Sequence, residues 1–274
     1  MIKTAQKEAN TTSQIITVAR YELLRYLREK KLYAAVAISV AVSLALVIIP
    51  GVFEFGLTPT VNDYFVLPVG FVFILIVICA AFFGSNSLLN DFYLKTGYVL
   101  FTNPIDRKSI WFGKFLAAES ISIGIIGMYY LIIAGGALYN FQTLSLEILA
   151  SVAFSFVVTT TVLSITFLIS SVFRGPTGAA VLVFLLFMFA LPLTELIITL
   201  TTDSQPWYSI IFSSKIIGSV LESQNALSLE DQIFLPRFDA KPDAAQSLLI
   251  LGAYITASIV ASLFLYQRKE MIEK

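Results

Sequence analysis

The sequence predicts an all-α integral membrane protein with six transmembrane helices, and three observations lead to this fold class. The composition is 57% apolar and 13% charged, whereas soluble domains are about 45–50% apolar and about 25% charged. Six long stretches contain no Asp, Glu, Lys or Arg, and a helix needs about 20 apolar residues to cross a membrane. The Lys and Arg residues between these stretches are unevenly distributed, which predicts an orientation.

Composition also excludes several kinds of active site. The chain has no His and a single cysteine, Cys79, inside an apolar run. It therefore lacks imidazole metal ligands and His-activated nucleophiles, and it can form neither an intrachain disulfide nor a thiolate metal cluster. No GxxxxGK(S/T) phosphate loop is present. We predict no enzyme, no catalytic residue, no metal site and no directly bound cofactor, and these absences disfavour an intramembrane enzyme.

The first element predicted is a helix at the membrane surface. Residues 1–13 are polar and predict a flexible tail, while 14–31 place Ile16, Leu23 and Leu27 on one helical face. Basic residues and tyrosines in this segment suit an elbow helix on an anionic leaflet, and a cap packed on a partner is the alternative. The elbow residues singled out are Arg20, Glu22, Leu23, Arg25 and Arg28.

The predicted spans are 32–53, 65–87, 110–138, 148–172, 176–198 and 246–267, in one transmembrane domain covering 1–274. Fifteen of the 18 Lys and Arg residues lie before the first span or after an even-numbered one. This bias predicts a multi-pass protein of the cell (plasma) membrane with both termini in the cytoplasm. Segment 199–245 is apolar at first but is interrupted by Pro206 and Lys215. It predicts re-entrant helices, followed by an extracellular loop.

Four polar residues of the spans are candidates for a translocation path or another intramembrane role: Glu119, Glu195, Thr160 and Ser164. A charged group in lipid is costly and by default marks a functional site. The alternatives are that Glu119 pairs with Lys114, that Glu195 already lies at headgroup level, and that the hydroxyls of the fourth span serve helix packing.

The connector at 88–108 is more ordered than a solvated loop. Leu88, Phe92 and Lys95 are spaced three or four residues apart, which predicts a short cytoplasmic helix, and Gly97 is suited to end it. Asn103-Pro104 predicts a turn. The chain then resumes as the third span.

The order of residues in and after this connector resembles that of a known family. It has Asp91, Gly97, Leu100-Phe101, Pro104-Ile105-Asp106-Arg107, Ile110 and Gly113-Lys114. This pattern resembles the permease (transmembrane) subunits of ATP-binding cassette (ABC) exporters, the class of multidrug, antibiotic-peptide and polysaccharide exporters. That family usually has Glu where Asp91 stands. An elbow helix, six spans and re-entrant helices before the last span are also typical of it.

The resemblance implies a permease that dimerises, with itself or with a second permease, and that binds a separate ABC ATPase subunit carrying ATP and Mg. It implies export of a peptide, drug or lipid-like substrate. Membrane lipids are expected partners, and nucleic acid is not. The connector would be a coupling helix with an ATPase interface formed by Leu89, Asp91, Phe92, Tyr93, Lys95, Gly97, Tyr98, Pro104 and Arg107. The alternative is an ion-coupled secondary transporter that uses Glu119.

Overall fold

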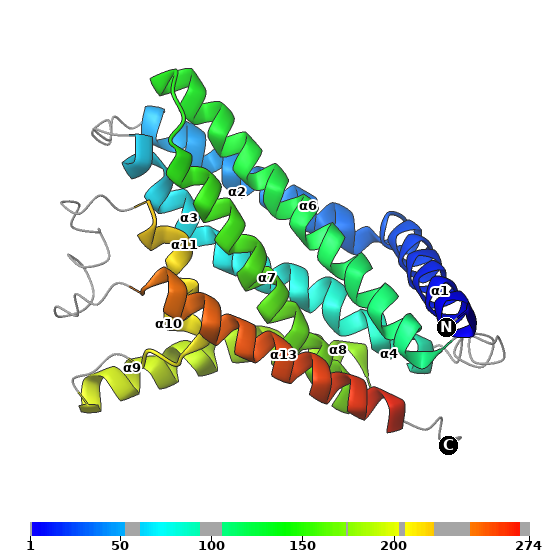
Figure 1. The fold of residues 1–274 in the computed structure, drawn as a ribbon. Coiled ribbons are helices and arrows are strands. Elements are labelled where there is room, and N and C mark those ends of the chain that lie inside the picture. Colours follow the sequence, from blue (N-terminus) through cyan, green and yellow to red (C-terminus); the bar gives the residue numbers. More distant parts are fainter. Residues whose placement is uncertain are drawn as a thin grey trace.

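The computed structural model describes residues 2–52, 61–93, 106–173, 175–202, 206–221 and 242–268, without the side chains of 2–10, 49–52, 63 and 90–93. All regular elements in these ranges are helices (Figure 1), which confirms the predicted all-α fold. They are α1 (Ile2–Tyr26), α2 (Lys30–Val52), α3 (Val61–Cys79), η1 (Ala80–Gly84), α4 (Ser85–Tyr93), α6 (Arg107–Phe141), α7 (Leu146–Val172), α8 (Pro176–Leu185), η2 (Leu186–Ala190), α9 (Leu191–Thr202), α10 (Ile210–Ser214), α11 (Ile216–Ser219) and α13 (Ala244–Arg268).

Six helical units in the described ranges are long and apolar enough to cross a membrane, as predicted. They are Lys30–Ile48, Tyr64–Leu89, Arg107–Phe141, Leu146–Val172, Pro176–Thr202 and Ala244–Arg268. The second unit runs from α3 through the π-helix η1 into α4 without a break. The described start of the predicted connector, 88–93, therefore continues the helix of the second span.

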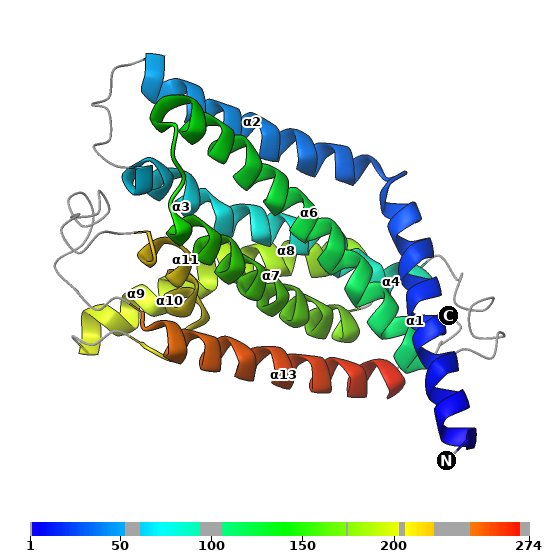
Figure 2. The same ribbon diagram turned by 45° about the horizontal axis from the view of Figure 1, so that its top comes forward.

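The units form a bundle in which α7 and the α3–η1–α4 unit are the most buried. Helix α13 runs beside α7 and α2 runs beside α6 (Figures 1 and 2). Helix α8 packs on α4, η1 and α7. The end of α4, the start of α6 and the end of α13 lie at one end of the bundle, which we call the connector end (Figure 1). The short helices α10 and α11 lie at the opposite end.

Helix α1 begins at Ile2 and so includes residues 2–13, for which the flexibility expected from the sequence stays a prediction. The predicted elbow segment corresponds to the rest of α1 and a turn at 27–29 before α2. Helix α1 packs on α6 (Figure 2), but through a different face from the predicted apolar one. Ile16 is 62% exposed and Leu27 is 50% exposed, whereas Glu22 is buried. The apolar face thus remains available to lipid, and its place at the membrane surface stays a prediction.

Helices α10 and α11 occupy the segment where re-entrant helices are predicted. The Ser209 hydroxyl caps α10 by accepting hydrogen bonds from the backbone N–H groups of Ile211 and Phe212. Both helices contact neighbouring long helices, α10 on α13 and α11 on α7. Their helical character is confirmed, and their re-entry into the membrane stays a prediction.

Candidate functional site

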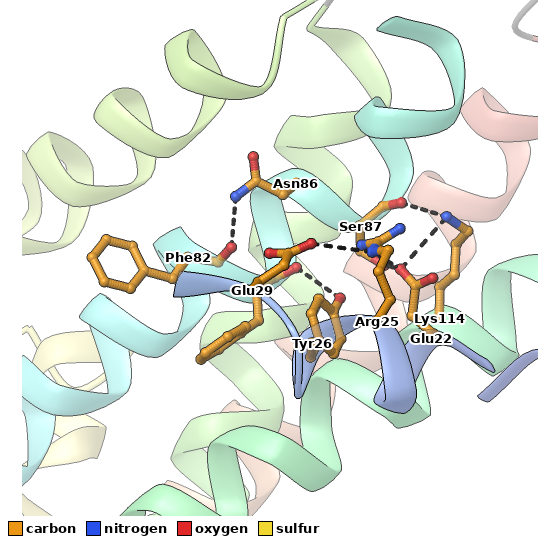
Figure 3. Close-up of polar contacts among 9 residues, drawn as sticks. Glu22, Arg25, Tyr26, Glu29, Phe82, Asn86, Ser87 and Lys114 are labelled. Carbon is orange, nitrogen blue, oxygen red and sulfur yellow. Dashed lines mark hydrogen bonds and ion pairs between the residues drawn. The ribbon is translucent and has the colours of Figure 1, made fainter. Parts of the chain in front are cut away.

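Three helices that are separate in the sequence meet at the connector end through polar side chains (Figure 3). We call this cluster the junction. It consists of Glu22, Arg25, Tyr26, Glu29, Phe82, Phe83, Asn86, Ser87 and Lys114. The junction is a candidate functional site because of its position, since α4 and α6 are the two helices that the connector joins.

The centre of the junction is a buried ion pair. Lys114 of α6 is 2% exposed and Glu22 of α1 is 7% exposed. Lys114 Nζ lies 3.6 Å from Glu22 Oε1 and donates a hydrogen bond to the backbone oxygen of Ser87 in α4 at 2.6 Å. The Ser87 hydroxyl donates to Glu22 Oε1 at 3.2 Å. One ammonium and one carboxylate therefore join α1, α4 and α6, and neither buried charge is isolated.

Arg25 extends this pair toward the turn between α1 and α2. Its Nη2 lies 2.7 Å from Glu22 Oε1, and its Nε donates to Glu29 Oε1 at 3.2 Å. The guanidinium carbon lies 5.1 Å from the centroid of the Tyr26 ring, within cation–π range. Two carboxylates face two cations, so these four side chains carry no net charge.

Tyr26 connects α1 to the π-helix of the second span. Its side chain is fully buried and its hydroxyl donates to the backbone oxygen of Phe83 at 3.1 Å. The preceding carbonyls also receive side-chain donors: Ser85 donates to Ala81, and Asn86 Nδ2 donates to Phe82 at 2.6 Å. A π-helix departs from the regular α-helical ladder and is frequent at functional sites. Here the carbonyls of the π-helix accept hydrogen bonds from Ser85 and Asn86, which follow it in the same helical unit, and from Tyr26 of α1.

Gly113 allows α1 to approach α6 closely. A Cβ atom at this position would lie 2.7 Å from Val18 Cβ and 2.9 Å from the backbone oxygen of Ile15. Any larger residue would push α1 away and would separate Glu22 from Lys114. The Gly-Lys pair at 113–114 thus has a packing role in this chain, since the first residue admits α1 and the second bonds to it.

The start of α6 is also held by the end of α13. Arg107 Nη1 donates to the backbone oxygen of Gln267 at 2.9 Å. One turn further along α6, Trp111 Nε1 donates to the Ser262 hydroxyl at 3.0 Å, and the Trp111 ring stacks on Phe115. Movement of the start of α6 would therefore act directly on the last span.

A comparison with known protein families agrees with this architecture. The family model described as "ABC-2 family transporter protein" matches residues 3–271, nearly the whole chain. The chain belongs to the ABC-2 transporter family. No curated protein matches it.

Membership confirms the resemblance seen in the sequence. ABC-2 permeases are the membrane subunits of ABC transporters and have no ATPase site of their own, so an ABC ATPase is the partner of such a subunit in general. Together with the six apolar helices, the family identifies this chain as a multi-pass membrane protein and a permease.

The ATPase interface predicted for this ABC-2 permease is only partly within the described residues. Asp91, Phe92 and Tyr93 belong to the last turn of α4, where side chains are not described, and Lys95, Gly97, Tyr98 and Pro104 lie outside the described residues. Leu89 is fully buried inside the chain in this conformation, and its role in ATPase docking stays a prediction. Arg107 is exposed but is bonded to α13.

The predicted elbow residues divide between two faces of α1. Arg20 and Arg28 are exposed, Leu23 and Arg25 are half-buried, and Glu22 is buried. Sequence reasoning missed the pairing of Glu22 with Lys114 because it placed the buried face of α1 on the apolar residues. A signal was present, since Val18, Glu22 and Tyr26 follow one another at helical spacing.

Each polar residue singled out in the spans has a partner in the structure. Lys114 pairs with Glu22 rather than with Glu119, whose Oε1 bonds to the Thr160 hydroxyl at 2.7 Å. Glu195 is buried and binds Lys215 Nζ at 2.9 Å and the Ser209 hydroxyl at 3.0 Å, which attaches the α10 segment to α9. Ser164 donates to the backbone of its own helix.

Replacing Tyr26 with Phe is expected to lower the free energy of unfolding by about 1–3 kcal/mol, because it leaves the Phe83 carbonyl without this donor. Burial raises the pKa of the Tyr26 phenol above its usual value. The hydrogen bond is therefore expected to contribute fully at every pH below the ordinary tyrosine pKa of about 10.

Thermal unfolding of the purified protein in detergent measures this effect. Tyr21→Phe is the matched control, because Tyr21 lies on the same helix and is exposed. Equal stability of the two variants would contradict the assigned role of Tyr26.

Proposed function

We propose that this chain is the permease subunit of an ABC exporter, that it functions as a dimer, and that a separate ATPase subunit binds its connector at 88–108. In this proposal the connector lies in the cytoplasm, where ATP is available, as the distribution of Lys and Arg predicts. The observation that carries the proposal is the junction, because it bonds the helices on both sides of the connector to each other.

The contacts support a mechanism in which the connector acts as a lever. The Lys114 bond to Ser87 joins α4 to α6, the Glu22 pair adds α1, and Arg107 adds α13. A displacement of the connector would therefore move several helices together rather than bend one. ATP binding by the partner can shift the permease between two conformations only through contacts that differ between them. We propose that the connector makes those contacts.

The proposal predicts that Tyr93→Arg weakens association with the ATPase subunit at least tenfold, because it places a new charge on the last turn of α4, within the connector. Copurification of the two subunits from cells expressing both measures association. Tyr139→Arg is the control, since Tyr139 is exposed at the far end of α6, and it is expected to leave association unchanged.

A wild-type chain that binds no ABC ATPase subunit would overturn the proposal. Transport by the chain alone, driven by an ion gradient, would instead support the secondary transporter. If Tyr93→Arg and Tyr139→Arg bind the ATPase equally, the permease assignment stands but the ATPase does not dock at the connector.

A further inference from the structure

Glu119 lies within the third span and faces α7. Its Oε1 lies 2.7 Å from the Thr160 hydroxyl oxygen. Its Oε2 is buried and has no hydrogen-bond partner among the described residues. Glu119 is partly buried, and an ionised carboxylate with one buried oxygen left without a donor is unfavourable in a membrane. The protonation state of this side chain therefore needs a physical explanation.

The number of protons available to the contacts of the Thr160 hydroxyl indicates the protonation state of Glu119. Its oxygen lies 2.7 Å from Glu119 Oε1 and 2.9 Å from the backbone oxygen of Phe156. A threonine hydroxyl has one proton to donate, and both a carbonyl oxygen and an ionised carboxylate only accept. If Glu119 were ionised, one of the two contacts would join two lone pairs. If Glu119 is protonated, it donates to Thr160, Thr160 donates to Phe156, and both contacts are hydrogen bonds.

Among the side chains that the structure describes, no cation is paired with Glu119. Lys114 on its own helix is paired with Glu22. The charged residues of the helices packed against α6 belong to α1 or lie near the ends of the spans. They are Lys3, Lys7, Glu8, Arg20, Glu22 and Arg25 of α1, Lys30 and Lys31 of α2, Asp63 of α3, Asp91 of α4, Glu147 of α7 and Arg268 of α13.

We propose that Glu119 and Thr160 form a proton-binding site within the membrane-spanning bundle, in which Glu119 is neutral and donates its hydrogen bond to Thr160. The proton comes from water when the carboxylate is enclosed between α6 and α7. It returns to water when the two helices part or water reaches the carboxyl group. The inference goes beyond the permease function and does not depend on the identity of the ATPase partner.

Infrared difference spectroscopy of the full chain in lipid nanodiscs at neutral pH tests the proposal. The spectrum of the wild type minus that of Glu119→Gln is expected to contain the C=O stretching band of a protonated carboxyl group. Glu195→Gln is the control, because Glu195 binds Lys215, and it is expected to remove no such band. Absence of a band specific to Glu119 would overturn the proposal.

A second variant tests the hydrogen bond and does not rely on Glu119→Gln folding. Thr160→Val keeps the shape of the side chain and removes the acceptor, so the Glu119 C=O band is expected to move to higher frequency. An unchanged band would show that Thr160 is not the acceptor. The spectra are recorded without the ATPase subunit, so failure here and failure of the permease proposal are separate results.

Discussion

Replacing Lys114 with Met is expected to lower the free energy of unfolding by about 3–5 kcal/mol, the usual loss when one partner of a buried ion pair is removed. Lys114 is 2% exposed, and its ammonium bonds α1 and α4 to α6. Without it, Glu22 keeps Arg25 and Ser87 as partners on one side and meets an apolar side chain on the other. Thermal unfolding in detergent, followed by size-exclusion chromatography, measures the loss.

Two further variants test whether the loss of stability in Lys114→Met arises from leaving a buried charge without its partner. The double variant Glu22→Gln with Lys114→Met removes both charges and is expected to recover most of the stability. Lys215→Met breaks a pair with a shorter separation, 2.9 Å against 3.6 Å, but the Lys215 side chain is 56% exposed. Because the Lys215 end of this pair is exposed to solvent and Lys114 is not, we expect Lys215→Met to cost less than Lys114→Met. Equal effects of Lys114→Met and Lys215→Met would contradict the role assigned to the junction.

Gly113→Ala is expected to lower the free energy of unfolding by about 1–3 kcal/mol through overpacking. The new Cβ would lie 2.7 Å from Val18 Cβ and 2.9 Å from the backbone oxygen of Ile15. Backbone cannot rotate away as a side chain can, so α1 as a whole must shift. Glu22 would move with it and lose its contact with Lys114.

The same substitution elsewhere on α6 provides a matched control. At Gly124 an added Cβ meets no atom within 4 Å, so Gly124→Ala is expected to be neutral or to stabilise the protein by up to about 1 kcal/mol through helix propensity. Adding Val18→Ala to Gly113→Ala removes only the contact with Val18 Cγ1 at 2.8 Å and leaves Val18 Cβ and the Ile15 oxygen in place, so rescue is expected to be partial at most. Gly113→Ala and Gly124→Ala with the same melting temperature would show that the close approach is unimportant.

Much of the fold follows from the sequence because the relevant signals are local. An apolar stretch about 20 residues long predicts a membrane span without reference to any other part of the chain, and the structure has the six units expected. The order of residues from Asp91 to Lys114 predicted an ABC permease, which family membership confirms. Both inferences depend on patterns along one segment.

The partners of individual side chains were decided by tertiary structure alone. Glu22 and Lys114 are far apart in the sequence and pair because Gly113 brings α1 against α6. Leu89 was singled out from the sequence as a docking residue, and only the packing of α4 shows that its side chain is buried within the chain. A sequence pattern reports periodicity along a helix, whereas an ion pair depends on how two helices are placed and rotated relative to each other. The sequence by itself therefore determined the class of the protein, its six spans and its family, and the packing of the helices decided which charged groups meet.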